Sequence, residues 1–200
     1  MSIDLQEFNQ EFLQDVYGSA DGDGKFVEDA FFETFCAHLV EAGELDTADR
    51  AHYVSPRGIR IDGYGGDPAK SGDVLSLIIA DLHPPSQEIK TLTKKDIDAI
   101  FKRGLNFVTK ALDERFRNQL EESAPAFGLA DLIAMRWPET IKVRLLLITN
   151  RLLSARIDGR QSDDIDGVPV TFGVWDLSRL HRFVVAGRGR EDIDIDLVSD

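Results

Sequence analysis

The chain has 200 residues, of which 42% are hydrophobic and 30% are charged, and its formal net charge is −13. A chain of this length buries roughly 70% of its unfolded surface, so it is expected to form one hydrophobic core without the help of disulfide bonds or structural metal ions. Its single cysteine, Cys36, excludes an intrachain disulfide and a cysteine zinc cage. The acidic balance works against a broad nucleic-acid surface, because phosphate contacts need Lys and Arg. Any nucleic-acid site is therefore expected to be local.

The composition along the chain predicts a cytoplasmic protein without a membrane partner. No run approaches 18 apolar residues, and residues 1–6 lack the basic and apolar regions of a secretory signal. Cys36 lies in an apolar stretch, which fits a buried thiol in a reducing compartment. No linker or repeat divides the sequence, so residues 1–200 are predicted to form one domain, the N-terminal part of a longer protein.

Two helices are predicted at the start of the chain. Apolar residues recur at helical spacing over residues 5–16, and this first helix is expected to end before the glycine-rich turn over 18–24. The second helix is predicted from Val27 to Ala42, with Gly43 as its stop.

A hairpin is predicted next. Tyr53 and Val54 come before a break at Pro56, and residues 58–64 alternate between apolar and polar, which indicates a strand. Turn residues over 65–73 then lead into an apolar run over 74–82. The two runs predict paired strands.

The second half predicts helices alternating with strands. Thr93 and Asp96 resemble a capping box, and apolar spacing predicts one long helix from there up to Pro125. A short helix closes at Trp137-Pro138. The elements expected after it are strands over 142–149 and 168–175, a helix capped by Asp176 and an edge strand over 190–197. This order predicts an α/β (α+β) fold with three layers, in which helices flank a mixed central sheet.

Three acidic residues and one histidine suggest metal chemistry at the hairpin. Hydrolysis of a phosphodiester with Mg²⁺ needs two or three converging carboxylates and a group that handles the attacking water. Asp62 and Asp81 lie at the ends of the two strands, and Glu33 on the second helix is placed to supply a third oxygen. His83 follows Asp81 by two residues and points the same way. We therefore predict Glu33, Asp62 and Asp81 as Mg²⁺ ligands, and Asp62, Asp81 and His83 as catalytic residues.

Each of these residues also has a purely structural interpretation. An Asp at a strand end often forms a turn, a His before two prolines can be a loop residue, and a Glu on a helix flank can be solvated. A second acid-x-lysine sequence, Glu88 to Lys90, lies beyond the double proline rather than on the apolar strand.

The order of these acids resembles the PD-(D/E)xK nuclease superfamily. In that superfamily a helix acid precedes a strand Asp, which is followed by (D/E)-x-K on the next strand. Glu33, Asp62 and the segment Asp81-Leu82-His83 match these positions. His83 replaces the lysine, and a neutral imidazole does not supply a fixed ammonium charge at pH 7. The resemblance implies a restriction-endonuclease-like core.

Longer stretches resemble the N-terminal part of the bacterial abortive-infection phage-resistance (AIPR) proteins. They are residues 57–64, 75–81, 148–151 and 174–180. The resemblance covers nearly the whole chain and implies a role in phage defence, with a C-terminal region of the longer protein as a partner.

Two functions are compatible with these residues. One is a nuclease module that uses Mg²⁺ and contacts nucleic acid through Lys94, Lys95 and Lys102. The other is a catalytically inactive module for interaction, dimerisation or sensing. A homodimer is expected in either case, because cyclic dimers are the commonest assembly.

Overall fold

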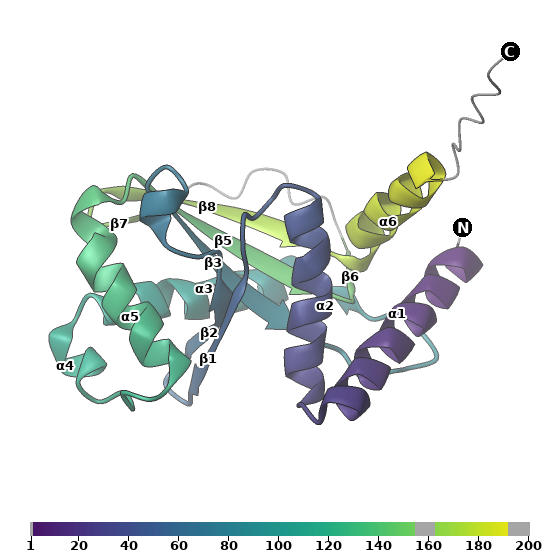
Figure 1. Cartoon of the computed structure of the whole chain (residues 1–200), viewed down its shortest axis with the longest axis horizontal. Helices are drawn as coiled ribbons and strands as arrows, with labels where there is room; N and C mark the ends of the chain where they lie inside the picture. The colour runs from purple at the N-terminus through teal and green to yellow at the C-terminus, as the bar shows by residue number, and fades with distance from the viewer. Residues whose placement is uncertain (1, 155–162, 192–200) are drawn as a thin grey trace, which may run out of the picture.

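A central sheet dominates the computed structural model, which describes residues 2–154 and 163–191. Within these residues the sheet has six strands in the order β1-β2-β3-β5-β8-β7 (Figure 1). The strands are β1 (Asp49–Ser55), β2 (Ile59–Tyr64), β3 (Val74–Asp81), β5 (Lys142–Thr149), β7 (Asp163–Ile165) and β8 (Val168–Trp175). Neighbours pair antiparallel except β3 with β5 and β5 with β8, which are parallel.

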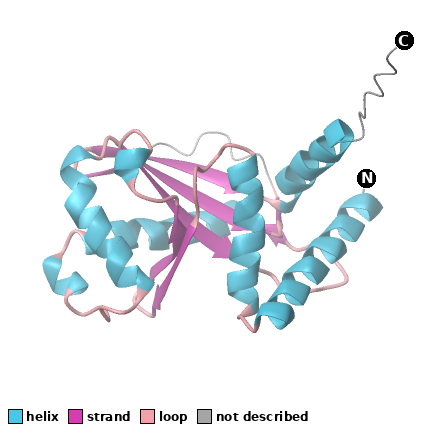
Figure 2. Cartoon of the chain, in the orientation of Figure 1, coloured by secondary structure: helices cyan, strands magenta, loops and turns pink. Residues whose placement is uncertain are grey.

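Helices cover both faces of the sheet (Figure 2). They are α1 (Ser2–Asp23), α2 (Val27–Glu41), α3 (Lys94–Ala111), α4 (Glu114–Arg117), α5 (Pro125–Arg136) and α6 (Leu177–Glu191). Short elements complete the fold: the 3-10 turns η1 (Pro68–Lys70) and η2 (Trp137–Glu139), and the paired strands β4 (Thr91–Leu92) and β6 (Leu152–Leu153). None of the described helices is long and apolar enough to cross a membrane.

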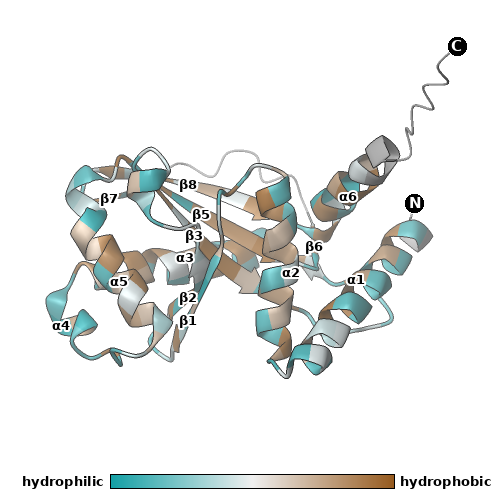
Figure 3. Ribbon diagram, viewed as in Figure 1, coloured by the Kyte–Doolittle hydropathy of each residue, from teal (hydrophilic) through white to brown (hydrophobic). Residues whose placement is uncertain are grey.

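Successive residues of the buried strands contribute to two separate cores. On β5, Leu145 and Leu147 pack with residues of α3 and α5, whereas Leu146 and Ile148 pack with residues of α1, α2 and α6. This division follows from the period of two in a strand. Figure 3 shows the hydrophobic residues concentrated on the central strands, as expected for strands that are buried on both sides. The predicted three-layer arrangement with a mixed sheet is confirmed.

The hairpin of β1 and β2 is tightly packed at Gly63. A Cβ atom at this position would lie 2.2 Å from Cζ of Phe32 and 2.5 Å from the backbone oxygen of Asp49, so only glycine fits there. The register of β1 against β2 shifts between Arg50 and Tyr53. β2 joins β3 through the residue pairs Gly63–Ile78 and Tyr64–Leu77. The hairpin therefore meets the rest of the sheet over a short ladder.

Most predicted elements agree with the structure, and two predicted helix ends are wrong. α1 continues through Gly18 to Asp23, because its buried face extends to Ala20. The predicted long helix ends at Ala111, where Asp113 caps the separate helix α4. The capping box of Thr93 and Asp96 is confirmed. Of the edge strand predicted over 190–197, the first two residues belong to α6 and the others lie outside the described residues.

Candidate functional site

A pocket of 580 Å³ lies where the start of α2 meets β1, β2 and the end of β3. We name it the Asp62 pocket. It is lined by Phe26, Glu28, Asp29, Phe31, Arg50, His52, Val54, Arg60, Asp62, Ala80, Asp81 and Leu82. Two of the predicted site residues, Asp62 and Asp81, thus line one pocket. The sequence reasoning did not single out Asp29, Arg50, His52 or Arg60, which also contribute to it.

The Asp62 carboxylate is buried and accepts four hydrogen bonds from the protein. Oδ1 accepts from Nη1 of Arg50 at 3.2 Å and is 2.8 Å from Nδ1 of His52. Oδ2 accepts from Nε of Arg60 at 3.0 Å and from the Ala80 amide at 2.9 Å. Two carboxylate oxygens offer about four lone-pair positions. Protein donors therefore fill the acceptor capacity of Asp62.

This environment stabilises the ionised form of Asp62. Burial by itself would raise the pKa of the carboxyl group, but the His52 hydrogen bond, the charges of Arg60 and Arg50 and the Ala80 amide lower it more. The net result is a pKa below the ordinary value of 3.8. Asp62 is therefore a charged, fully paired residue at neutral pH.

Side chains of β2 replace backbone pairing at the end of β3. The amide of Ala80 donates to Asp62, and its carbonyl accepts from Nη2 of Arg60. Both backbone groups of this residue are therefore satisfied by side chains of the neighbouring strand. Arg60 and Asp62 are two residues apart, and their hydrogen bonds to Ala80 connect β2 to β3 outside the backbone ladder of Gly63–Ile78 and Tyr64–Leu77.

Arg50 extends the cluster to α2. Its Nε donates to Asp29 at 2.7 Å, while Nη1 also donates to the Asp62 carbonyl at 3.0 Å. The guanidinium lies 5.2 Å from the centre of the Phe32 ring, which adds a cation–π contact. Arg50 therefore holds two acidic residues of the pocket at once.

Asp81 forms a separate ion pair with Arg151, which lies two residues beyond the end of β5. Arg151 binds it through two bonds, from Nε to Oδ2 at 2.8 Å and from Nη2 to Oδ1 at 2.9 Å. The Thr149 hydroxyl donates to Oδ2 at 2.8 Å. A bidentate arginine is the strongest common partner of a carboxylate.

The structure does not bring Glu33 and His83 to this pocket. The Glu33 carboxylate is exposed and pairs with Lys25 at 2.5 Å. The backbone of His83 is held by Asn150, whose Oδ1 accepts from the His83 amide at 2.7 Å and whose Nδ2 donates to the His83 carbonyl at 2.8 Å. The His83 ring lies 2.8 Å, through Nδ1, from the Pro84 carbonyl oxygen. Asp29, rather than Glu33, is the acid of α2 that joins the cluster.

The residues of the Asp62 pocket do not fit a Mg²⁺ ion in this arrangement. Mg²⁺ requires free oxygen ligands in near-octahedral order. The oxygens of Asp62 are filled by four donors, and those of Asp81 by Arg151 and Thr149. In residues 2–154 and 163–191, no three His, Cys, Asp or Glu side chains are placed to hold one metal ion.

The three lysines predicted to contact nucleic acid lie on α3, Lys94 and Lys95 at its start and Lys102 in its middle. All are exposed, and Lys94 pairs with Asp98 at 2.9 Å. None of them lines the Asp62 pocket. Contacts of Lys94, Lys95 and Lys102 with nucleic acid stay a prediction, as does the homodimer.

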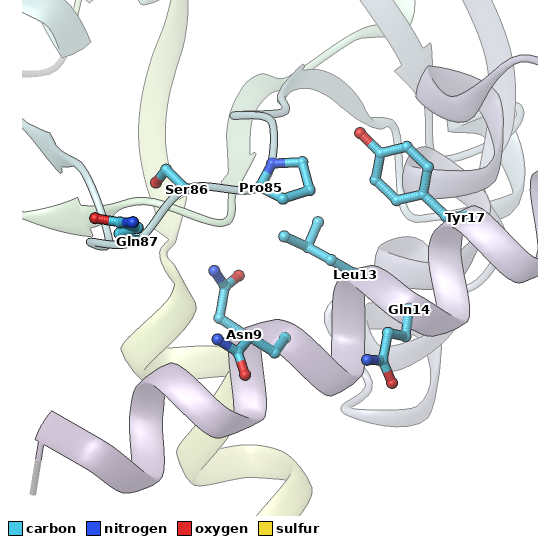
Figure 4. Close-up of a pocket in the computed structure, with 8 residues that line it drawn as sticks. Asn9, Leu13, Gln14, Tyr17, Pro85, Ser86 and Gln87 are labelled. Carbon is cyan, nitrogen blue, oxygen red and sulfur yellow. The ribbon is translucent and has the colours of Figure 1, made fainter.

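Another pocket, of 540 Å³, lies between α1 and the loop after β3 (Figure 4). Its lining residues are Asn9, Gln10, Leu13, Gln14, Tyr17, Pro85, Ser86 and Gln87. Figure 4 shows Leu13 and Tyr17 beside Pro85, with amide side chains around them. The lining consists of amide, hydroxyl and apolar side chains, without a carboxylate, imidazole or cationic group.

Comparison with known protein families gives a match over most of the chain. The family described as abortive infection phage resistance protein N-terminal domain matches residues 31–182. No curated protein and no solved structure matches the chain. The matched segment includes the hairpin with Arg50, His52, Arg60 and Asp62, and it extends into α6. The chain belongs to the family of N-terminal domains of abortive infection phage resistance proteins.

Proposed function

We propose that the chain is a recognition module of a phage-defence protein and that it works without a divalent metal at Asp62. The observation that carries this proposal is the filled carboxylate of Asp62, which accepts two hydrogen bonds on each oxygen. A buried carboxylate paired in this way fixes the geometry of its neighbours. The function would be to bind a signal and pass it to the C-terminal region of the longer protein.

Metal-dependent phosphodiester hydrolysis is the second candidate. It is favoured by the presence of Asp29, Asp62 and Asp81 in one pocket. Binding of a metal there would require Asp62 to exchange the charged donors Arg50 and Arg60 for the ion. Breaking a buried ion pair costs about 3–5 kcal/mol. A metal site would therefore need a rearrangement of the hairpin.

Calorimetric titration with Mg²⁺ and Mn²⁺ distinguishes the two candidates. We expect no stoichiometric binding of either ion, and the same heats of titration for the wild type, Asp62→Asn and Asp81→Asn. Glu33→Gln is the matched control, because it removes an exposed charge from the predicted ligand set. EDTA is expected to leave the thermal midpoint unchanged. Stoichiometric binding that is lost in both Asp variants would overturn the proposal and favour the nuclease.

A further inference from the structure

The other side of the β1–β2 hairpin carries a second polar pocket, of 730 Å³, which we name the basic pocket. It is lined by Tyr53, Ser55, Arg57, Ile59, Asn106, Thr109, Lys110, Asp113, Arg115, Phe116 and Gln119. On β1, His52 and Val54 line the Asp62 pocket, whereas Tyr53 and Ser55 line the basic pocket. This distribution follows the period of two in a strand.

Three cations of the basic pocket have no carboxylate partner within residues 2–154 and 163–191. Arg57, Lys110 and Arg115 are exposed, and their charged groups make no ion pair with the described residues. The lining carboxylate is that of Asp113, whose Oδ1 accepts from the Arg115 amide at 2.9 Å. Arg50, Arg60 and Arg151 are paired, by contrast. The basic pocket is therefore a local positive region on a chain with a net charge of −13.

The walls of the basic pocket are ordered by contacts with the core. The Tyr53 ring packs edge-on against Phe116, with 5.7 Å between ring centroids and 89° between planes. Nδ2 of Asn106 donates to the Gly58 carbonyl at 2.9 Å, which ties α3 to the turn that carries Arg57. Gly58 has a φ of 78°, as this turn requires. The site therefore combines fixed aromatic walls with free cationic ends.

We propose that the basic pocket binds a nucleotide, with Arg57, Lys110 and Arg115 contacting its phosphates and Tyr53 lying against its sugar or base. Guanidinium and ammonium groups are the usual partners of phosphate oxygens, and arginine offers two parallel hydrogen bonds. The pocket volume lies in the range of small-ligand sites. The phosphates belong either to a free nucleotide or to a nucleic-acid strand. This inference does not depend on whether Asp62 binds a metal.

Equilibrium binding tests the basic pocket with three probes in the presence of EDTA. The probes are a fluorescein-labelled single-stranded oligonucleotide, ADP and inorganic pyrophosphate. We expect Arg57→Gln, Lys110→Gln and Arg115→Gln each to weaken binding about tenfold, as for a lost charged hydrogen bond. The affinity is expected to fall as salt is raised. Binding of the oligonucleotide alone identifies a strand as the ligand, and binding of ADP identifies a free nucleotide.

A variant outside the basic pocket controls for total charge. Lys90 is exposed and lies in the loop before β4, so Lys90→Gln removes one positive charge without touching the pocket. We expect it to bind like the wild type. Equal weakening by Lys90→Gln and the three pocket variants would overturn the proposal, as would the absence of binding to all three probes at low salt. Because EDTA is present throughout, neither result reports on a metal at Asp62.

Discussion

Oδ1 of Asp62 lies 2.8 Å from Nδ1 of His52. Since an ionised carboxylate can only accept, the ring must carry a proton on Nδ1. Neutral His52 is therefore expected in the Nδ1–H tautomer, which is the less common one in solution. Long-range ¹⁵N–¹H correlation spectra measure this directly. The preference is expected to disappear in Asp62→Ala, which leaves no side-chain acceptor for Nδ1–H, and an Nε2–H tautomer in the wild type would contradict the hydrogen bond.

Removal of the Asp62 charge is expected to destabilise the fold. Asp62→Asn leaves Arg50 and Arg60 without their shared carboxylate, and loss of one partner from a buried pair costs about 3 kcal/mol or more. Urea unfolding followed by circular dichroism gives the change in the free energy of unfolding. Glu33→Gln serves as the control, because its pair with Lys25 is exposed. Equal midpoints for the two variants would show that the Asp62 cluster contributes little.

The Asp62 cluster also predicts a dependence of stability on acid. The pKa of Asp62 is below 3.8 in the folded chain, so its stabilising effect is complete above the ordinary carboxyl pKa and is lost as the pH falls through the lowered value. The difference in unfolding free energy between wild type and Asp62→Asn should therefore be constant near neutral pH and shrink below about pH 4. Urea titrations at a series of pH values measure it. If the difference in unfolding free energy between wild type and Asp62→Asn grew as the pH fell, the pKa of Asp62 would be raised in the folded chain rather than lowered.

Gly63 is expected to tolerate no side chain. Gly63→Ala would place Cβ against Phe32 and the Asp49 carbonyl, and overpacking of this kind costs about 1–3 kcal/mol. Gly18→Ala is the matched control, because a Cβ there meets nothing within 4 Å and Gly18 is inside α1. Alanine should stabilise that helix by about 0.5–1 kcal/mol. Thermal unfolding of the two variants should therefore shift in opposite directions.

Cys36 is expected to be inert in the folded protein. Burial raises the pKa of its thiol to about 12, more than the nearby Arg50 lowers it. The side chain is 2% exposed, so both the thiolate fraction and access are small. A thiol reagent at mildly alkaline pH should modify Cys36 only in denaturant. Rapid modification of the native chain would indicate local opening of α2.

The elements that sequence predicted best are those with strong local signals. The apolar runs were sufficient to predict the strands β3 and β5, and the capping box at Thr93 was sufficient to predict the start of α3. The two wrong helix ends had local signals that packing overrode. Gly18 weakens a helix by about 1 kcal/mol, but burial of Val16 and Ala20 in the core that α1 shares with α2 continues the helix through it. The apolar spacing persists past Ala111, yet the side chain of Asp113 caps a new turn.

The Asp62 pocket was predictable only in part. Asp62 and Asp81 stood out because they follow apolar strand residues. Arg60 and Asp62 are two residues apart, a spacing that places side chains near each other on one strand. The contribution of Arg50 and His52 depends on how β1 pairs with β2, and that register contains an irregularity between Arg50 and Tyr53. The spacing of residues along one strand does not show which residues of the next strand lie opposite, least of all where the register is irregular. The partners of Asp62 on β1 could therefore not be predicted from the sequence.

The hydrogen bond from the Ala80 amide to the Asp62 carboxylate makes the contact between β2 and β3 sensitive to acid. A hydrogen bond between strand backbones persists whatever the acidity, but the amide of Ala80 binds a carboxylate that can accept a proton. The attachment of the edge hairpin to β3 therefore depends in part on proton concentration, whereas β3, β5 and β8 are joined along their length by backbone ladders. In acid the outer two strands should separate from their neighbours before the centre of the sheet opens, and the exchange rate of a single amide hydrogen would record that separation.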